Sequence, residues 1–222
     1  MYRNPFAPDF KDLPETLPVF PLSGVLLLPF GQLPLNVFEP RYVRMVDDAL
    51  KGARIIGMIQ PRMAYDDGEN PALYTVGCAG KITEFSHTED GRYLISLTGL
   101  CRFRVTEELA VNTPYRQVRG AWGDFESDLG RKACLGVERA KLESLLDAYF
   151  ERHNMSCDFK KFEGVADGNL MTCLSMICPF EPQEKQALLE QVCCAERAKL
   201  FMKMLEMAIK QNGHESGGCC CH

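Results

Sequence analysis

The sequence predicts an α+β protein with a β-rich N-terminal part and a helical C-terminal part. Up to about residue 125, short apolar segments recur between turns that are rich in Gly, Asp and Pro. Alternation with a period of two is typical of half-buried strands, and repeated short strands with one helix are typical of a small barrel. Beyond that point, apolar residues recur every three or four positions, which is typical of amphipathic helices.

These changes along the chain predict four segments. Residues 1–16 are polar and form a flexible arm, and 17–125 form the β-rich subdomain. Residues 126–212 form the helical subdomain, and 213–222 form a disordered, cysteine-rich tail.

A series of short strands is predicted in the β-rich subdomain. Pro18 and Pro21 interrupt the first strand, over 17–22. Because proline has no N–H to donate to a ladder, this strand should lie at a sheet edge or pair irregularly. Other strands are predicted over 33–38, 54–60, 75–87, 93–98, 102–106 and 115–120, with a loop over 61–71 and a turn over 88–91.

One helix is predicted within the β-rich subdomain. Glu39 is at its N-cap, and Pro40 suits the first helical position, where the missing N–H costs nothing. Gly52 is predicted to end this helix in the left-handed conformation.

Helices account for most of the C-terminal part. They are predicted over about 131–151, 158–164 and 167–177, the last with Leu170, Leu174 and Ile177 facing inward. A long final helix begins at Pro182, with Leu189, Val192, Leu200, Met204 and Ala208 along one side.

Charge and apolar content limit the partners and the compartment. The net charge is −5 and neither part is basic, which argues against nucleic acid as the partner. Residues 1–11 have no secretory signal, and the apolar runs are far shorter than the ~20 residues of a membrane span. We therefore expect a cytoplasmic protein with reduced cysteines and no membrane association. Five cysteines lie in apolar patterns and are expected to be buried: Cys78, Cys101, Cys173, Cys178 and Cys193.

The sequence has no recognisable catalytic motif. Gly80-Lys81 is followed by Ile82 rather than by Ser or Thr, so no phosphate loop is present. Neither Gly-x-Ser-x-Gly nor Ser-x-x-Lys occurs, and His87 and His153 are expected at the surface. Adjacent side chains diverge in 219–222 (Cys-Cys-Cys-His), which disfavours a closed zinc site. We expect no catalytic residues, no metal and no cofactor.

A mixed cluster joins the second predicted strand to the first helix: Phe38, Glu39, Pro40, Arg41 and Tyr42. One interpretation is a recognition corner with Arg41 and Tyr42 exposed. The other, which we prefer, is a helix cap with Glu39 at the positive end of the helix dipole.

Four ordered segments together resemble the N-terminal substrate-binding domain of Lon proteases. They lie within 17–31, 33–42, 76–82 and 91–105, and the resemblance extends over about 17–210. It implies a PUA-like β pseudo-barrel followed by a helical bundle, and a role in recognising polypeptide. In Lon this domain precedes an ATPase and a Ser–Lys peptidase, which have no counterpart in this sequence.

The resemblance leads to two hypotheses. In the first, the module binds unfolded or disordered polypeptide segments through sheet edges or apolar grooves, and hands them to a protease or a chaperone. In the second, the barrel binds a small ligand or RNA through Arg and aromatic side chains. The candidate binding residues are Phe38, Glu39, Arg41, Tyr42, Arg92, Tyr93, Arg102 and Arg104.

Overall fold

A computed structural model describes residues 2–3, 6, 8–62, 70–131, 138–153 and 162–211. The chain divides into two compact units. The barrel unit comprises residues 1–132 and 172–190, and the helical unit comprises 133–171 and 191–222. The segment 172–190 therefore groups with the strands, although its sequence pattern assigned it to the helical subdomain.

The predicted α+β class is confirmed by the order of elements. The barrel unit contains β1 (Tyr2–Arg3), η1 (Phe10–Asp12), β2 (Thr16–Pro21), β3 (Gln32–Val37), α1 (Pro40–Lys51), β4 (Ile55–Ile59), β5 (Val76–His87), β6 (Tyr93–Glu108), β7 (Gln117–Ala121), η2 (Gly123–Leu129), β8 (Gly130–Arg131) and α4 (Pro182–Glu190). The helical unit contains α2 (Arg139–Arg152) and α5 (Cys194–Gln211), and α3 (Asp167–Ile177) runs from the helical unit into the barrel unit.

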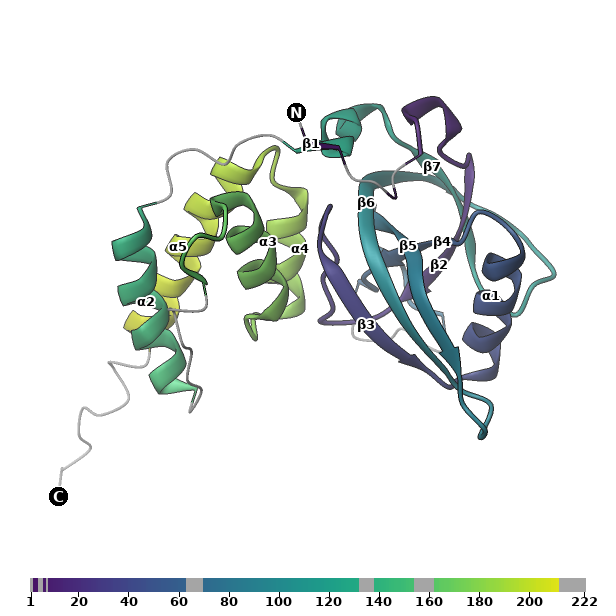
Figure 1. Ribbon diagram of the computed structural model, residues 1–222, viewed down its shortest axis with the longest axis horizontal. Coiled ribbons are helices and arrows are strands. Elements are labelled where there is room, and N and C mark those ends of the chain that lie inside the picture. Colours follow the sequence, from purple (N-terminus) through teal and green to yellow (C-terminus); the bar gives the residue numbers. More distant parts are fainter. Residues whose placement is uncertain are drawn as a thin grey trace, which may run out of the picture. The chain divides into compact units, whose positions relative to one another are not determined.

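A closed circuit of strands forms the barrel. The main sheet has the order β3-β6-β5-β4-β2-β7, and β7 also pairs with β6. This last pairing closes β6, β5, β4, β2 and β7 into a barrel (Figure 1). The 16-residue strand β6 makes the closure possible, because its first half pairs with β3 and β5 and its second half with β5 and β7. Among the described strands, β3 pairs with β6 alone and stays outside the circuit.

The first predicted strand corresponds to β2, which lies inside the sheet. Residues 16–18 pair with β7, whereas 19–21 pair with β4. Of the two predicted alternatives, an edge position or irregular pairing, the structure shows the second. The change of partner follows Pro18, which has no N–H for a ladder on either side.

Phe103 lies at the centre of the barrel core and is fully buried. A Cβ on Gly77 would lie 2.6 Å from the Cζ of this ring, and a Cβ on Gly57 would lie 2.9 Å from it. Only glycine lets the backbones of β4 and β5 approach the ring so closely. The position of Phe103 therefore depends on two glycines from other strands.

Buried polar side chains attach α4 to the barrel. The amide of Gln60 donates to the carbonyl oxygen of Pro182 over 2.9 Å, and the amide of Gln186 donates to the carbonyl of Val76 over 3.1 Å. The ammonium of Lys185 donates to the carbonyl of Gly24 over 2.9 Å. Burial lowers the pKa of Lys185. These bonds link α4 directly to strand ends and loops of the barrel unit.

In the helical unit, α2 and α5 pack against each other. Lys141 and Glu206 form an ion pair of 2.9 Å between them. At the start of α2, Arg139 donates to Asp167 over 2.7 Å. The buried apolar residues of the two helices include Leu142, Leu146, Tyr149, Phe150, Phe201 and Leu205.

The predicted strand and helix positions are largely confirmed, with three corrections. The predicted final helix is broken into α4 and α5, and Val192, in the break, is 82% exposed. Ile177 faces outward at the end of α3. Gly52 follows α1 with φ −116°, and the left-handed conformation falls instead on Arg54, with φ 59°. The segments predicted over 61–71 and 158–164 lie mostly outside the described residues, as does the whole tail 213–222.

The cysteine predictions were only partly right. Cys78, Cys101 and Cys178 are buried as expected. Cys173, within α3, and Cys193, in the break before α5, are exposed. Cys194 is disulfide-bonded, so the expectation of reduced cysteines is wrong for this residue.

Candidate functional site

One side of β3 is an unpaired edge among the described strands of the barrel unit. Its six residues pair antiparallel with the first half of β6, from Gln32 opposite Thr98 to Val37 opposite Tyr93. On its other side, β3 pairs with no described strand, and Figure 1 shows it at the end of the sheet. Backbone N–H and C=O groups on an unpaired edge can pair with another extended chain.

The register determines which backbone groups point outward. Gly99 donates its N–H to the carbonyl of Gly31 over 2.8 Å, so this pair, one step before β3, is hydrogen-bonded. Hydrogen-bonded and non-bonded pairs alternate in an antiparallel ladder. The backbone groups of Gln32, Pro34 and Asn36 therefore point away from β6. Pro34 has no N–H, so the outward edge has a carbonyl at all three positions and a donor only at Gln32 and Asn36.

Two large apolar side chains are exposed beside this edge. Leu94 lies directly opposite Asn36, and Phe38 follows Asn36 by two residues, so both are on the outer face of the sheet. Phe38 is 65% exposed and Leu94 is 47% exposed. We refer to the outward backbone of Gln32, Pro34 and Asn36, together with Phe38 and Leu94, as the β3 edge site. Of these five residues only Phe38 was predicted from the sequence, which carries no distinguishing signal for Gln32, Pro34, Asn36 and Leu94.

The residues that follow Phe38 build the start of α1. Glu39 is at the N-cap but makes no side-chain capping hydrogen bond, and its carboxylate instead pairs with Arg41 at 2.9 Å. The guanidinium of Arg41 lies 4.5 Å from the ring centre of Tyr42. Tyr42 is buried and stacks on Phe20, with 4.2 Å between ring centres, and burial raises its pKa. Arg41 is therefore exposed, whereas Tyr42 belongs to the core.

Arg92 and Tyr93 lie at the β5–β6 hairpin, near the end of β3. Arg92 pairs with Asp90 at 2.5 Å. The hydrogen bonds that Asp90 accepts from Arg92 and Thr88 hold its pKa at about 2. Tyr93 donates its hydroxyl proton to Asp47 of α1 over 2.7 Å, which raises the pKa of Tyr93. The structure thus brings Arg92 and Tyr93 close to Phe38, with both polar groups already bonded.

Arg102 and Arg104 lie in the second half of β6. About 30 Å of extended strand separates Arg102 from Tyr93. The side chain of Arg102 is 2% exposed, and it donates to both carboxylate oxygens of Asp128 and to the carbonyl of Leu189. Arg104 is exposed and pairs with Asp124 at 3.0 Å. Arg102 therefore holds the barrel together and does not share a surface with the β3 edge site.

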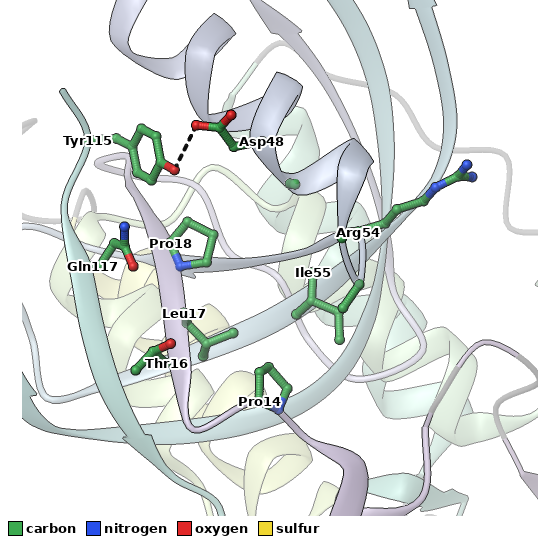
Figure 2. Close-up of a pocket in the computed structure, with 12 residues that line it drawn as sticks. Pro14, Thr16, Leu17, Pro18, Asp48, Arg54, Ile55, Tyr115 and Gln117 are labelled. Carbon is green, nitrogen blue, oxygen red and sulfur yellow. Dashed lines mark hydrogen bonds between the residues drawn. The ribbon is translucent and has the colours of Figure 1, made fainter. Parts of the chain in front are cut away.

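A small pocket lies between β2, α1 and β7 (Figure 2). Its volume of about 220 Å³ is below the ~300–1,000 Å³ of typical small-molecule sites. The hydroxyl of Tyr115 donates to Asp48 over 3.1 Å, and Asp48 also accepts from Arg44 over 2.9 Å. The guanidinium of Arg54 points away from the pocket in Figure 2. The main polar groups of the pocket are therefore hydrogen-bonded within the protein, which leaves few polar contacts for a ligand.

The described part of the chain holds no cluster of three or more His, Cys, Asp or Glu side chains that could bind a metal ion. No described helix has the length and apolarity that a membrane crossing requires. Cys101 is buried, and burial together with Asp128 raises the pKa of its thiol. This thiol is therefore a poor nucleophile.

Comparison with known proteins points to one family. The family model described as the ATP-dependent protease La (LON) substrate-binding domain matches residues 16–207. The chain is 28% identical over 200 residues to Lon protease 2 of Myxococcus xanthus, and 32% identical over 200 residues to Lon protease of Anaeromyxobacter dehalogenans. These matches cover 88% of this chain but only 24% and 23% of the relatives, so the chain spans about a quarter of their length.

Solved structures show the same fold. The Lon N-terminal domain protein from Xanthomonas campestris aligns with a TM-score of 0.60 at 23% identity, over 85% of this chain and 97% of that one. The N-terminal domain of the Mycobacterium avium complex Lon protease aligns with a TM-score of 0.58 at 14% identity, over 86% of this chain and 98% of that one.

Proposed function

Since the chain belongs to the LON substrate-binding domain family, we propose that it is a non-catalytic module that binds unfolded polypeptide at the β3 edge site. The observation that carries this proposal is an unpaired strand edge next to the exposed side chains of Phe38 and Leu94. Extended polypeptide can satisfy backbone groups at such an edge and cover apolar side chains beside it.

The family relationship supports binding rather than catalysis for these residues. The match covers a substrate-binding domain, and the sequence contains neither a phosphate-loop motif nor a Ser-x-x-Lys motif. We propose that the module acts in the cytoplasm as an adaptor and presents bound polypeptide to a protease or a chaperone. The net charge of −5 fits a partner other than nucleic acid.

The alternative of a small-ligand or RNA site has less support. Arg102 and Arg104 are engaged with Asp128 and Asp124, and Arg92 is engaged with Asp90. RNA recognition requires guanidinium or aromatic groups that can stack on bases or bind phosphates. Of the predicted residues, Phe38, Arg41 and Arg92 are exposed and lie at the β3 edge site or next to it, and both arginines are paired with carboxylates.

Replacing Phe38 with aspartate should weaken polypeptide binding about tenfold to a hundredfold. Burying a phenylalanine against a ligand contributes about 1.5–3 kcal/mol, and a carboxylate at this point would also have to be desolvated. The measurement is fluorescence anisotropy with labelled, reduced and carboxymethylated α-lactalbumin, which remains unfolded without denaturant.

Phe85→Asp is the matched control. Phe85 is 49% exposed and lies opposite Ile95, on the other face of the sheet from Leu94. We expect this variant to bind like the wild type, and both variants to retain the wild-type melting temperature. Equal affinity for Phe38→Asp and the wild type would refute the β3 edge site, and lack of binding by the wild-type protein would refute polypeptide binding itself.

A further inference from the structure

We infer that the β3 edge site captures its ligand by strand addition, in which an extended segment of another, unfolded chain pairs antiparallel with β3. This inference rests on the proposed function and specifies how the polypeptide is held. The ligand class is an extended segment with apolar side chains at alternate positions. Backbone pairing supplies most of the contacts, and the apolar side chains supply the selectivity.

The positions of the outward backbone groups define the pairing. Gln32 and Asn36 can each exchange two hydrogen bonds with a residue of the added strand, whereas Pro34 can only accept one. In an antiparallel pair, directly opposed residues project their side chains on the same face. Ligand residues that bond to Gln32, Pro34 and Asn36 therefore project on the face of Phe38 and Leu94. The alternate residues project on the opposite face and direct their N–H groups away from β3.

Pro34 also argues against a second copy of this chain as the ligand. In the symmetric antiparallel register that pairs Gln32 of one β3 with Asn36 of the other, Pro34 of one copy lies opposite Pro34 of the other. Neither proline has an N–H, so the central pair would make no hydrogen bond. A ligand strand with a normal residue at that position donates to the carbonyl of Pro34. The edge thus favours a foreign strand over self-association, as expected for edge strands that avoid aggregation.

Backbone methylation of a peptide tests strand addition directly. The probe is a labelled nine-residue peptide in which valine and threonine alternate. One set of peptides carries N-methyl groups on the valines, and the other carries them on the threonines. We expect methylation of the valines to weaken binding at least about tenfold, because their N–H groups donate to β3 while their side chains contact Phe38. Methylation of the threonines should have little effect, since their N–H groups point to solvent.

The outcomes separate this inference from the proposed function. Suppose that the unmodified peptide binds. If both methylated sets then bind as tightly as the unmodified peptide, or if only the threonine-methylated set binds more weakly, antiparallel strand addition is wrong, whereas polypeptide binding still stands. If neither the unmodified peptide nor the unfolded protein binds, the proposed function itself fails.

A gain-of-binding variant gives a second test. Pro34→Ala adds the missing N–H at the centre of the edge, and one further hydrogen bond should tighten binding of the unmodified peptide about fivefold. Pro34 is exposed and its nitrogen points away from β6, so the fold should be retained; a thermal melt checks this. Sedimentation velocity should show increased self-association of the variant, because the central pair can now form. Unchanged peptide affinity in the folded variant would contradict strand addition.

Discussion

Arg102→Met is expected to lower the free energy of unfolding of the barrel unit by about 3–5 kcal/mol, the usual cost of removing one partner of a buried ion pair. The guanidinium of Arg102 contacts both carboxylate oxygens of Asp128, at 2.7 and 2.8 Å, and the carbonyl of Leu189 at 2.9 Å. Burial opposes the charge of Arg102, but the hydrogen bonds and attraction of Asp128 outweigh it and raise the pKa of the guanidinium. Without Arg102, the 10%-exposed carboxylate of Asp128 would remain uncompensated. Urea unfolding followed by circular dichroism measures the change.

The neighbouring residue Arg104 supplies the matched control. It lies two positions along the same strand and pairs with Asp124, but its side chain is 46% exposed. Exposed ion pairs contribute about 0–1 kcal/mol, so Arg104→Met should have little effect. The double variant Arg102→Met with Asp128→Leu should recover much of the lost stability, because it removes both charges. Our account of this network is wrong if Arg102→Met costs no more than Arg104→Met.

Phe103→Ala is expected to cost a similar amount, about 3–5 kcal/mol, because it leaves a cavity in the barrel core. The ring is fully buried and lies against the backbone of two other strands. Since strand closure surrounds it on several sides, the barrel should collapse only partly into the vacated space. Urea unfolding again measures the effect. Phe85→Ala, an exposed phenylalanine on β5, should change the stability by less than about 1 kcal/mol.

A double-mutant cycle tests the role of the glycines around Phe103. A Cβ at Gly57 would meet Cζ of Phe103 at 2.9 Å and Cγ1 of Val19 at 3.2 Å, so Gly57→Ala alone should destabilise the barrel. When combined with Phe103→Ala, the new methyl group would enter the cavity. The combined cost should therefore be smaller than the sum of the two single costs. Additive costs would show that the ring and Gly57 do not constrain each other.

The proposed binding mode is compatible with a rigid barrel. β3 is outside the closed circuit of β6, β5, β4, β2 and β7, so a strand added to β3 extends the sheet without opening the barrel. The two stability variants and Phe38→Asp consequently test different properties. The variants at Arg102 and Phe103 test the free energy of unfolding, whereas Phe38→Asp tests the affinity of the folded protein for polypeptide.

The sequence by itself determined the nature and order of most elements. Alternation over 33–38 identified β3, and the Glu39–Pro40 start with a spaced apolar face identified α1. The ordered segments between 17 and 105 also identified the family, which the comparisons confirmed. These features are local, because side-chain period, caps and prolines act within a few residues of the chain.

Only the tertiary structure decided which strand is left unpaired. Pro18 and Pro21 predicted an edge position or irregular pairing for the first strand, yet β2 is enclosed, whereas β3, for which no edge was predicted, is open. The same holds for the candidate residues: Arg92 and Arg102 look alike in sequence, but one is at a hairpin and the other is buried against Asp128. The physical reason is that pairing and burial depend on contacts between distant segments, such as Gln32 with Thr98. Local periodicity specifies a strand, but the partners that close the barrel determine whether its edge can bind another chain.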